Sequence, residues 1–346
     1  MSIHVLQLGT YPPPEGGITR NMLAIRERLR ERGDRCSIIA TSKSSRVVEE
    51  ADVYHPHSAT ELISLIRKTD HDILHLHVGG DVTRRVLSLM LAAATFGKRP
   101  ILSFHSGGYP RTAEAQKARP ISARGRIFRR FERIVAMNEE LADLFRRYGV
   151  ASERLDVIAP FALTPPDPNT KLRADIAEFA KSHSPLLASI GGLEPDYEPM
   201  FLIETMRDVL EKHANAGLVI VGGGSMRAEA EAALAATRYP NAVMLAGDVP
   251  HDETLKLIAM ADVMLRITLF DGDAISVREA LFVGTPVIAT DNGMRPAGVT
   301  LTPQGDGDQL VKRIDEVLAQ QPKRPVRITP DLSNIDKILA LYVGLL

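Results

Sequence analysis

The feature that most constrains the fold is a series of short apolar runs that alternate with helical patterns. In the first half of the chain these runs lie at residues 3–8, 35–40, 73–77, 101–105 and 133–137. Each run is five or six residues long and apolar through most of its length, which is typical of parallel strands buried on both faces. Their alternation with helices predicts βαβ units around a parallel sheet, and therefore an α/β fold.

A proline-rich segment interrupts this rhythm and divides the chain. Residues 159–168 read APFALTPPDP, a composition that suits a connector between domains. A second βα series follows, with apolar runs at residues 186–190, 218–221, 243–246, 263–267 and 286–289. A chain of 346 residues also favours two domains, because single cores stop growing near ~250–300 residues. We predict one Rossmann-like domain over 1–163, a second over 164–330, and a final helix within 331–346.

Composition excludes several function classes. The formal net charge of −1 gives no global attraction for nucleic acid. The only cysteine, Cys36, rules out an intramolecular disulfide and a cysteine-based metal cluster, and it fits a reducing compartment. The N-terminal run reads as a buried strand rather than a signal peptide, and no run reaches the roughly 18 apolar residues that span a bilayer. We therefore expect a soluble cytoplasmic protein with no nucleic-acid partner.

One segment departs from this neutral balance. Residues 111–154 carry eleven Lys and Arg residues against six Asp and Glu residues. Two interpretations are open: a solvated helix face, or a patch for anionic lipid or a lipid-phosphate acceptor. The second interpretation predicts peripheral contact with the inner face of a membrane.

Loops that follow strands in the first series are candidate ligand sites, because ligands bind outside the carboxyl ends of parallel strands. Gly16 and Gly17 precede a predicted helix and allow close approach of an anion, but they form no G-x-G-x-x-G fingerprint, which disfavours a dehydrogenase. His75 and His77 alternate onto one sheet face; no third zinc ligand accompanies them, so we expect His75 in the core and His77 near a ligand. His105 ends its strand before small residues, which leaves room for a ligand.

The strongest motif lies in the second series. Residues 270–281 read FDGDAISVREAL and are followed by GTPVIAT, which predicts a loop, a helix, a turn and a buried strand. Either Asp273 or Ser276 could cap the helix. The first helical N–H groups favour a diphosphate, and they belong to the segment Ala274, Ile275, Ser276 and Val277. Asp271 and Glu279, eight residues apart, can accept hydrogen bonds from different hydroxyls of one sugar nucleotide.

This motif resembles the nucleotide-sugar site of family 4 retaining glycosyltransferases of the GT-B fold, in which two Rossmann-like domains face each other across a cleft. The family carries E-x7-E followed by E-A-x-x-x-G-x-P-V-I, and here Asp271 and Glu279 take the two acidic positions. The resemblance covers nearly the whole chain. It extends to weaker matches at Gly16, Gly17, His105, Gly222, Gly223 and Gly247.

The resemblance implies an enzyme and assigns roles. A sugar would pass from a nucleoside diphosphate sugar, most often of UDP or GDP, to a hydroxyl of a carbohydrate or lipid-linked acceptor, with retention and without a metal or other cofactor. Such reactions occur in polysaccharide and lipid-linked glycan biosynthesis. Glu279 would hold the ribose, Asp271 and His105 would lie at the donor sugar, and the loops at Gly222 and Gly247 would surround the base. The final helix would pack back onto the N-terminal domain.

Two departures from the family pattern bear on activity. The family has G-R-L-x-x-x-K at the first strand of the second domain, and here Gly192 and Tyr197 replace the two cations that stabilise the leaving diphosphate. Arg266, Arg278 and Arg295 lie near the motif and are candidate substitutes. The loss of both cations motivates one alternative, a non-catalytic sugar-nucleotide-binding module. A second alternative is another two-domain enzyme that acts on sugar nucleotides, such as an epimerase.

Overall fold

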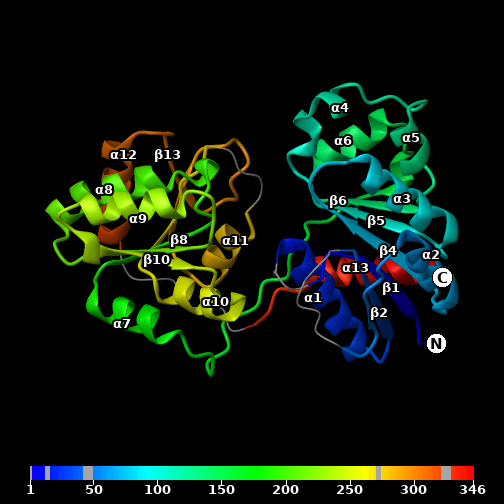
Figure 1. Cartoon of the computed structure of the whole chain (residues 1–346), viewed down its shortest axis with the longest axis horizontal. Coiled ribbons are helices and arrows are strands. Elements are labelled where there is room, and N and C mark those ends of the chain that lie inside the picture. Colours follow the sequence, from blue (N-terminus) through cyan, green and yellow to red (C-terminus); the bar gives the residue numbers. More distant parts are fainter. Residues whose placement is uncertain (1, 12–15, 42–49, 270–273, 321–328) are drawn as a thin grey trace. The chain divides into compact units, whose positions relative to one another are not determined.

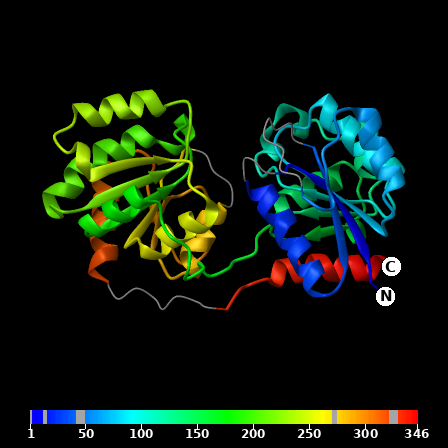
Figure 2. The same cartoon turned by 60° about the horizontal axis from the view of Figure 1, so that its bottom comes forward.

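The computed structural model describes residues 2–11, 16–41, 50–269, 274–320 and 329–346. The chain forms two compact units (Figures 1 and 2). Unit 1 contains residues 1–162 and 331–346, and unit 2 contains residues 163–330. In the described part of the chain, no helix is long and apolar enough to cross a membrane.

Unit 1 is built on a parallel sheet of seven described strands. Their order is β3-β2-β1-β4-β5-β6-β7, which is the doubly wound order with its switch point between β1 and β4. The five strands predicted from apolar runs are present, and β3 and β7 are short, partly exposed additions. The bounds are β1 His4–Gly9, β2 Arg35–Ala40, β3 Val53–Tyr54, β4 Ile73–Val78, β5 Ile101–Phe104, β6 Arg133–Ala136 and β7 Leu155–Val157.

Helices cover both faces of this sheet. Alternate strand residues such as Leu74 and Leu76 pack against α2, α3, α5 and α6, whereas Val5 and Ile73 pack against α1 and α13. Side-chain caps begin five of these helices and satisfy backbone N–H groups of the first turn. The helices are α1 Gly17–Glu31, α2 Ala59–Lys68, α3 Arg84–Phe96, α4 Ala113–Gln116, α5 Ala123–Phe128, α6 Glu139–Arg147 and α13 Ser333–Leu345.

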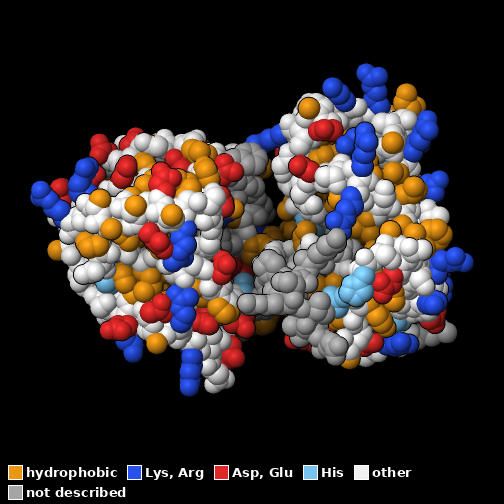
Figure 3. All heavy atoms as spheres, viewed as in Figure 1, with side chains coloured by type: hydrophobic (Ala, Val, Ile, Leu, Met, Phe, Trp, Pro, Cys, Tyr) orange, Lys and Arg blue, Asp and Glu red, His pale blue; other side chains and the backbone are white. Residues whose placement is uncertain are grey.

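The basic segment 111–154 supplies α4, α5, β6 and α6. Lys and Arg side chains gather on the surface over these helices (Figure 3). Most of them are exposed, and the loop between α4 and α5 also presents Ile121 at 74% exposure. Some of this charge is neutralised locally, as in the ion pair between Arg146 and Asp143.

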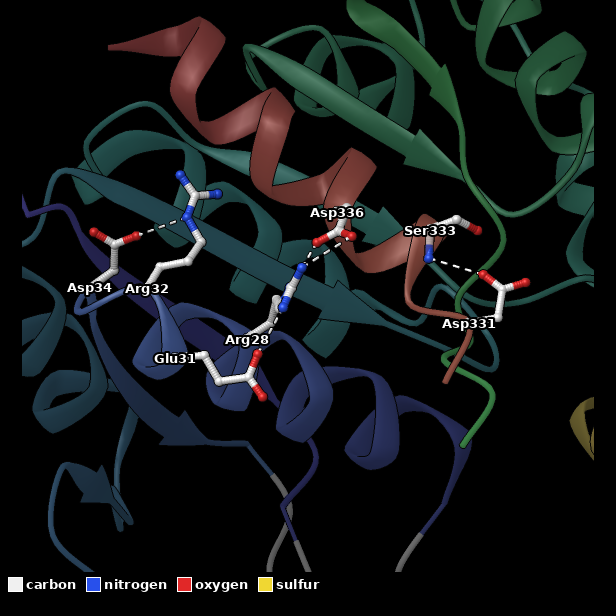
Figure 4. A network of polar contacts seen from close by, with 7 residues as sticks. All are labelled: Arg28, Glu31, Arg32, Asp34, Asp331, Ser333 and Asp336. Atoms are coloured by element: carbon white, nitrogen blue, oxygen red, sulfur yellow. Dashed lines mark hydrogen bonds and ion pairs between the residues drawn. The ribbon is translucent and has the colours of Figure 1, made fainter. Parts of the chain in front are cut away.

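The last helix, α13, belongs to unit 1 although 168 residues of unit 2 precede it. It lies along α1, and Arg28 of α1 donates two hydrogen bonds to Asp336, at 2.8 and 3.3 Å (Figure 4). Its apolar side buries Ile338 and Leu339 in the same core as the first strands. This packing brings Tyr342 beneath the centre of the sheet, where it contacts His75.

Unit 2 repeats the architecture with six described strands in the order β10-β9-β8-β11-β12-β13. The order is again doubly wound, with its switch point between β8 and β11. The strands are β8 Leu186–Ile190, β9 Gly217–Val221, β10 Val243–Gly247, β11 Val263–Arg266, β12 Val287–Thr290 and β13 Val299–Thr302. The helices are α7 Ala174–Ser182, α8 Pro199–Lys212, α9 Arg227–Ala236, α10 His251–Met260, α11 Ile275–Phe282 and α12 Gly307–Ala319.

Candidate functional site

The carboxyl edge of the second sheet gathers most of the predicted site residues of unit 2. The loops after β8, β9, β10 and β11 all leave from this edge, because the strands are parallel. At the switch point, Gly191 follows β8 and Arg266 ends β11. In doubly wound sheets a ligand binds at this point, outside the carboxyl ends of the strands.

Arg266 fills the space beside the two altered positions of the first loop. Its side chain donates a hydrogen bond to the carbonyl of Ile190, and its guanidinium carbon lies 4.8 Å from the ring centroid of Tyr197. A Cβ atom on Gly191 would lie only 3.3 Å from an Arg266 nitrogen. Arg266 is 8% exposed, so the guanidinium lies in a largely desolvated position. A cation therefore lies over Tyr197 and beside Gly191, the residue before Gly192, although it comes from another strand.

The other two candidate cations lie on different elements. Arg295 donates to the carbonyl of Thr290 at 3.0 Å and to Oγ1 of Thr268 at 3.1 Å, which ties it to the ends of β12 and β11. It therefore lies at the same sheet edge as Arg266. Arg278 is a partly exposed residue of α11.

Glu279 lies on α11 and is 7% exposed. Its Oε1 atom accepts a hydrogen bond of 2.6 Å from Nε2 of His251, the first residue of α10. A carboxylate only accepts, so His251 carries a proton on Nε2. The other imidazole nitrogen lies 3.5 Å from Oδ1 of Asp252. This pair fixes Oε1 of Glu279, and no hydrogen bond engages its second carboxylate oxygen in the described part of the chain.

The start of α11 differs from one expectation. The helix begins at Ile275, its N-cap is Ala274, and Ser276 is its second residue, so the prediction that Ser276 caps the helix is wrong. An alanine methyl group cannot accept a hydrogen bond, so no N-cap side chain satisfies the first-turn N–H groups, although the N–H of Val277 donates to the Ala274 carbonyl at 3.2 Å. Asp271 and Asp273 lie outside the described residues.

The glycine turns after β9 and β10 contact each other. Gly222 donates to the carbonyl of Gly247 at 2.8 Å, and a Cβ atom on Gly222 would lie 1.7 Å from the Gly191 carbonyl oxygen. Only glycine fits there, and its φ of +126° requires glycine as well. Gly223 donates to Oδ1 of Asp248 at 2.9 Å, which fixes the turn. The predicted base-binding loops at Gly222, Gly223 and Gly247 therefore form one rigid surface beside the first strand.

Unit 1 brings His105 together with the two histidines of β4. Nε2 of His105 lies 3.2 Å from Nδ1 of His77, and the two rings stack with centroids 5.5 Å apart. His75 is fully buried, as predicted, between Tyr342 and Ser103. His77 is also buried, at 3% exposure, so the expectation that it reaches a ligand itself is wrong; its neighbour His105 is the partly exposed member.

The first loop of unit 1 takes a simpler form. Gly16 is the N-cap of α1 with extended backbone, and Gly17 is the first helical residue. A Cβ atom on Gly16 would meet nothing within 4 Å, so this glycine faces open space. The binding of an anion at this helix start stays a prediction.

His251 is a candidate site residue that sequence reasoning missed. It contacts Glu279 across 28 positions of sequence, through the packing of α10 on α11. The available signal was weak: a histidine that follows Pro250 at a predicted helix start in the loop after β10.

Fold and site together define a protein of two doubly wound α/β units with a ligand-binding edge in the second. A family model described as glycosyl transferases group 1 matches residues 173–329, and a model described as glycosyltransferase family 4 matches residues 15–162. The chain belongs to these group 1, family 4 glycosyltransferases, and the predicted family and GT-B fold are confirmed.

Individual relatives agree with this assignment. The D-inositol 3-phosphate glycosyltransferase of Corynebacterium efficiens is 28% identical over 201 residues, which cover 54% of this chain and 46% of that protein. The 2-deoxystreptamine glucosyltransferase of Streptomyces kanamyceticus is 23% identical over 248 residues, which cover 66% of this chain and 62% of that protein. The chain thus spans about half to three fifths of the length of these relatives.

A solved structure extends the likeness to the whole chain. HepE of Anabaena, crystallised with UDP-glucose, superposes with a TM-score of 0.69 at 16% identity and covers 99% of this chain and 100% of its own. At this identity the likeness shows the shared fold.

Proposed function

We propose that this protein transfers a sugar from a nucleoside diphosphate sugar to an acceptor hydroxyl, and that unit 2 holds the donor. The observation that carries the proposal is Glu279, a nearly buried carboxylate held by His251 at the carboxyl edge of a doubly wound sheet. A buried carboxylate with one oxygen committed to the protein is suited to hydroxyl pairs such as those of ribose.

The remaining donor contacts follow from the same edge. The first N–H groups of α11 and the guanidinium of Arg266 receive the diphosphate, with Arg295 and Arg278 as further candidate cations. The fixed turn at Gly222, Gly223 and Gly247 borders the base, which we propose is uracil or guanine. Asp271 and His105 contact the sugar. HepE, of the same fold, binds UDP-glucose, which supports a nucleotide-sugar ligand.

The reaction proposed is metal-independent and proceeds with retention. Helix N–H groups and arginine side chains neutralise the diphosphate in place of a metal ion. The bond from the anomeric carbon to the phosphate oxygen breaks, the acceptor oxygen bonds to the same face, and the departing phosphate takes the acceptor proton. Because the phosphate accepts the proton, this mechanism needs no side-chain base.

The acceptor proposed is a carbohydrate or lipid-linked glycan intermediate, which places the protein in the cytoplasm at the inner face of a membrane. The exposed arginines of segment 111–154, together with the 74% exposed side chain of Ile121, support contact with anionic lipid. Vesicles containing phosphatidylserine should retain the protein at low salt and release it at high salt. Absence of co-sedimentation at low salt would contradict this contact.

Turnover tests the transferase proposal against its two alternatives. The protein is incubated in EDTA with UDP- and GDP-sugars, with and without candidate glycan acceptors, and the products are separated by chromatography. Acceptor-dependent release of one nucleoside diphosphate, with an extended glycan, is expected. An epimerised donor formed without acceptor would instead indicate an epimerase. An inert wild type that gains turnover in Gly192→Arg/Tyr197→Lys would indicate a non-catalytic binding module.

A further inference from the structure

Three histidines, two of them buried, form a continuous chain in unit 1 that ends at His105. We define the histidine chain as His75, His77 and His105. Ring centroids of His75 and His77 lie 4.1 Å apart, and those of His77 and His105 lie 5.5 Å apart. Its inner end is anchored by the hydroxyl of Tyr342 at 2.5 Å from His75 and by Ser103 at 2.8 Å. Its outer end, His105, follows β5 at the ligand-binding edge of the first sheet.

The outer end of the chain faces an opening. His105 lines a small hollow together with Asn21, Met137 and Pro160, and the residue is partly exposed. Its backbone N–H donates to the carbonyl of Val78 at 2.7 Å, which fixes the residue to the end of β4. A ring nitrogen of His105 can therefore contact a ligand without movement of the backbone.

Each member of the chain is neutral at pH 7. Burial lowers the pKa of His75 to about 3 and that of His105 to about 4, and it lowers the pKa of His77 well below its usual value. A neutral imidazole has one N–H donor and one acceptor nitrogen. The question for catalysis is then which nitrogen of His105 carries the proton.

The contact between His77 and His105 answers this question. If Nδ1 of His77 carries the proton, this N–H group donates to Nε2 of His105. Nε2 of His77 is then an acceptor that receives no hydrogen bond. If instead His105 donates, the Nε2–H group of His77 must point at no acceptor, because this buried atom has no hydrogen-bond partner among the described residues. An orphaned buried N–H is rarer in proteins than an under-used acceptor. The first arrangement therefore prevails.

We propose that His77 is a positioning residue that holds His105 as the Nδ1–H tautomer, so that His105 donates one hydrogen bond from Nδ1 to a hydroxyl oxygen of the bound sugar. The role of His105 at the sugar rests on the proposed function, whereas its tautomer does not. The hydrogen bond from His77 also leaves Nε2 of His105 engaged as an acceptor. Only the Nδ1 edge remains to meet the ligand.

The tautomer is measured directly on the full chain labelled with ¹⁵N-histidine, by long-range ¹H–¹⁵N correlation spectra. The wild type should show a protonated Nδ1 and an unprotonated Nε2 on His105. His77→Asn places an amide N–H where Nδ1 was and should keep this pattern, whereas His77→Phe should give a mixture of tautomers. An Nε2-protonated His105 in the wild type would overturn the proposal without requiring any variant to fold, as would an unchanged tautomer in a folded His77→Phe.

Kinetics separate this proposal from the proposed function. His77→Phe should lower kcat/KM for the donor roughly three- to tenfold, the value of one neutral hydrogen bond, and His77→Asn should stay within about twofold of wild type. Equal losses in both variants would overturn the positioning role. If His105→Phe leaves turnover unchanged while the wild-type tautomer is as expected, the role of His105 at the sugar fails and the tautomer assignment stands.

Discussion

Replacement of Arg266 by glutamine should reduce turnover by about two orders of magnitude. Arg266 lies at the switch point of the second sheet, over Tyr197 and beside Gly191, the residue before Gly192. Gly192 and Tyr197 are the two positions where this chain lacks the cations typical of its family. If Arg266 supplies that missing charge, its loss removes the main cation that faces the leaving diphosphate. Glutamine keeps a hydrogen-bond donor but carries no charge.

The expected size follows from two separate effects. One donor aimed at developing charge is worth about 3 kcal/mol, which corresponds to roughly 150-fold in kcat. Stability changes as well, because the carbonyl of Ile190 loses its donor and Tyr197 loses its cation. These losses cost about 1–3 and about 1–2 kcal/mol. A typical domain with 5–15 kcal/mol tolerates them, so the variant should still be folded in a turnover assay at low temperature.

The assay compares kcat and KM for the donor, in EDTA, for the wild type, Arg266→Gln and Arg266→Lys. Arg207→Gln is the matched control, because Arg207 is an exposed residue of α8 that pairs only with its neighbour Asp208 in the described structure. Lysine retains the charge but loses the planar fork, so Arg266→Lys should fall between wild type and Arg266→Gln. The loss should appear in kcat, because the interaction strengthens as the diphosphate leaves.

Two results would refute this reasoning. If Arg266→Gln stays within threefold of Arg207→Gln, Arg266 does not carry the catalytic charge. If KM rises while kcat is unchanged, Arg266 contributes only to ground-state binding. In either case Arg295, tied to the same sheet edge, becomes the next cation to replace.

Three further predictions follow from the same contacts. His251→Leu should weaken nucleotide binding about tenfold or more in calorimetry, because Glu279 loses its hydrogen-bond donor. His251→Gln keeps a donor for Glu279 and should weaken binding less. Equal effects of the two variants would contradict the proposal that His251 positions the Glu279 carboxylate. Glu198 has φ +45°, a left-handed backbone conformation that is strained for every residue except glycine. Glu198→Gly should therefore raise the free energy of unfolding by about 1 kcal/mol in urea titrations, and a decrease would show that the backbone at Glu198 is not strained. Burial depresses the pKa values of His75 and His105, so their contribution to stability is present above pH 6.5 and lost as the pH falls toward 4. The free energy of unfolding at pH 5 should be roughly 2 kcal/mol lower for each of these two histidines than at pH 7, and equal urea midpoints would contradict this.

The sequence was informative where burial alone determines structure. Strands such as β1 and β4 are buried on both faces, so a continuous apolar run identifies them. The strands β3, β7 and β13 escaped prediction because they are short and partly exposed, and pairing with a neighbouring strand stabilises them more than burial does. Helix starts were less predictable, as the cap of α11 illustrates, because a one-residue shift changes which side chain can reach the first N–H groups.

The site residues also differ in whether a local sequence pattern identifies them. Glu279 could be found because its motif is contiguous in sequence. The hydrogen bond from His251 and the stacking of Arg266 on Tyr197 depend on how helices and strands pack across 28 and 69 positions of sequence, and no local pattern encodes that packing. His77 shows the limit of periodicity: alternation placed it on the correct face of β4, but only the packing of α1 and α13 on that face shows that it is buried.

The most direct test of the donor site is a dye-based thermal shift with UDP, GDP, ADP and CMP in EDTA, on wild type, Glu279→Ala and the exposed control Glu211→Ala. A nucleotide at 100 times its Kd stabilises by ~2.7 kcal/mol, or about 5 °C at roughly 2 °C per kcal/mol. We predict such a shift with UDP or GDP for wild type and Glu211→Ala, and its loss in Glu279→Ala. If no nucleotide shifts the wild type at millimolar concentration, or if Glu279→Ala keeps the full shift, the donor site is not where we propose it.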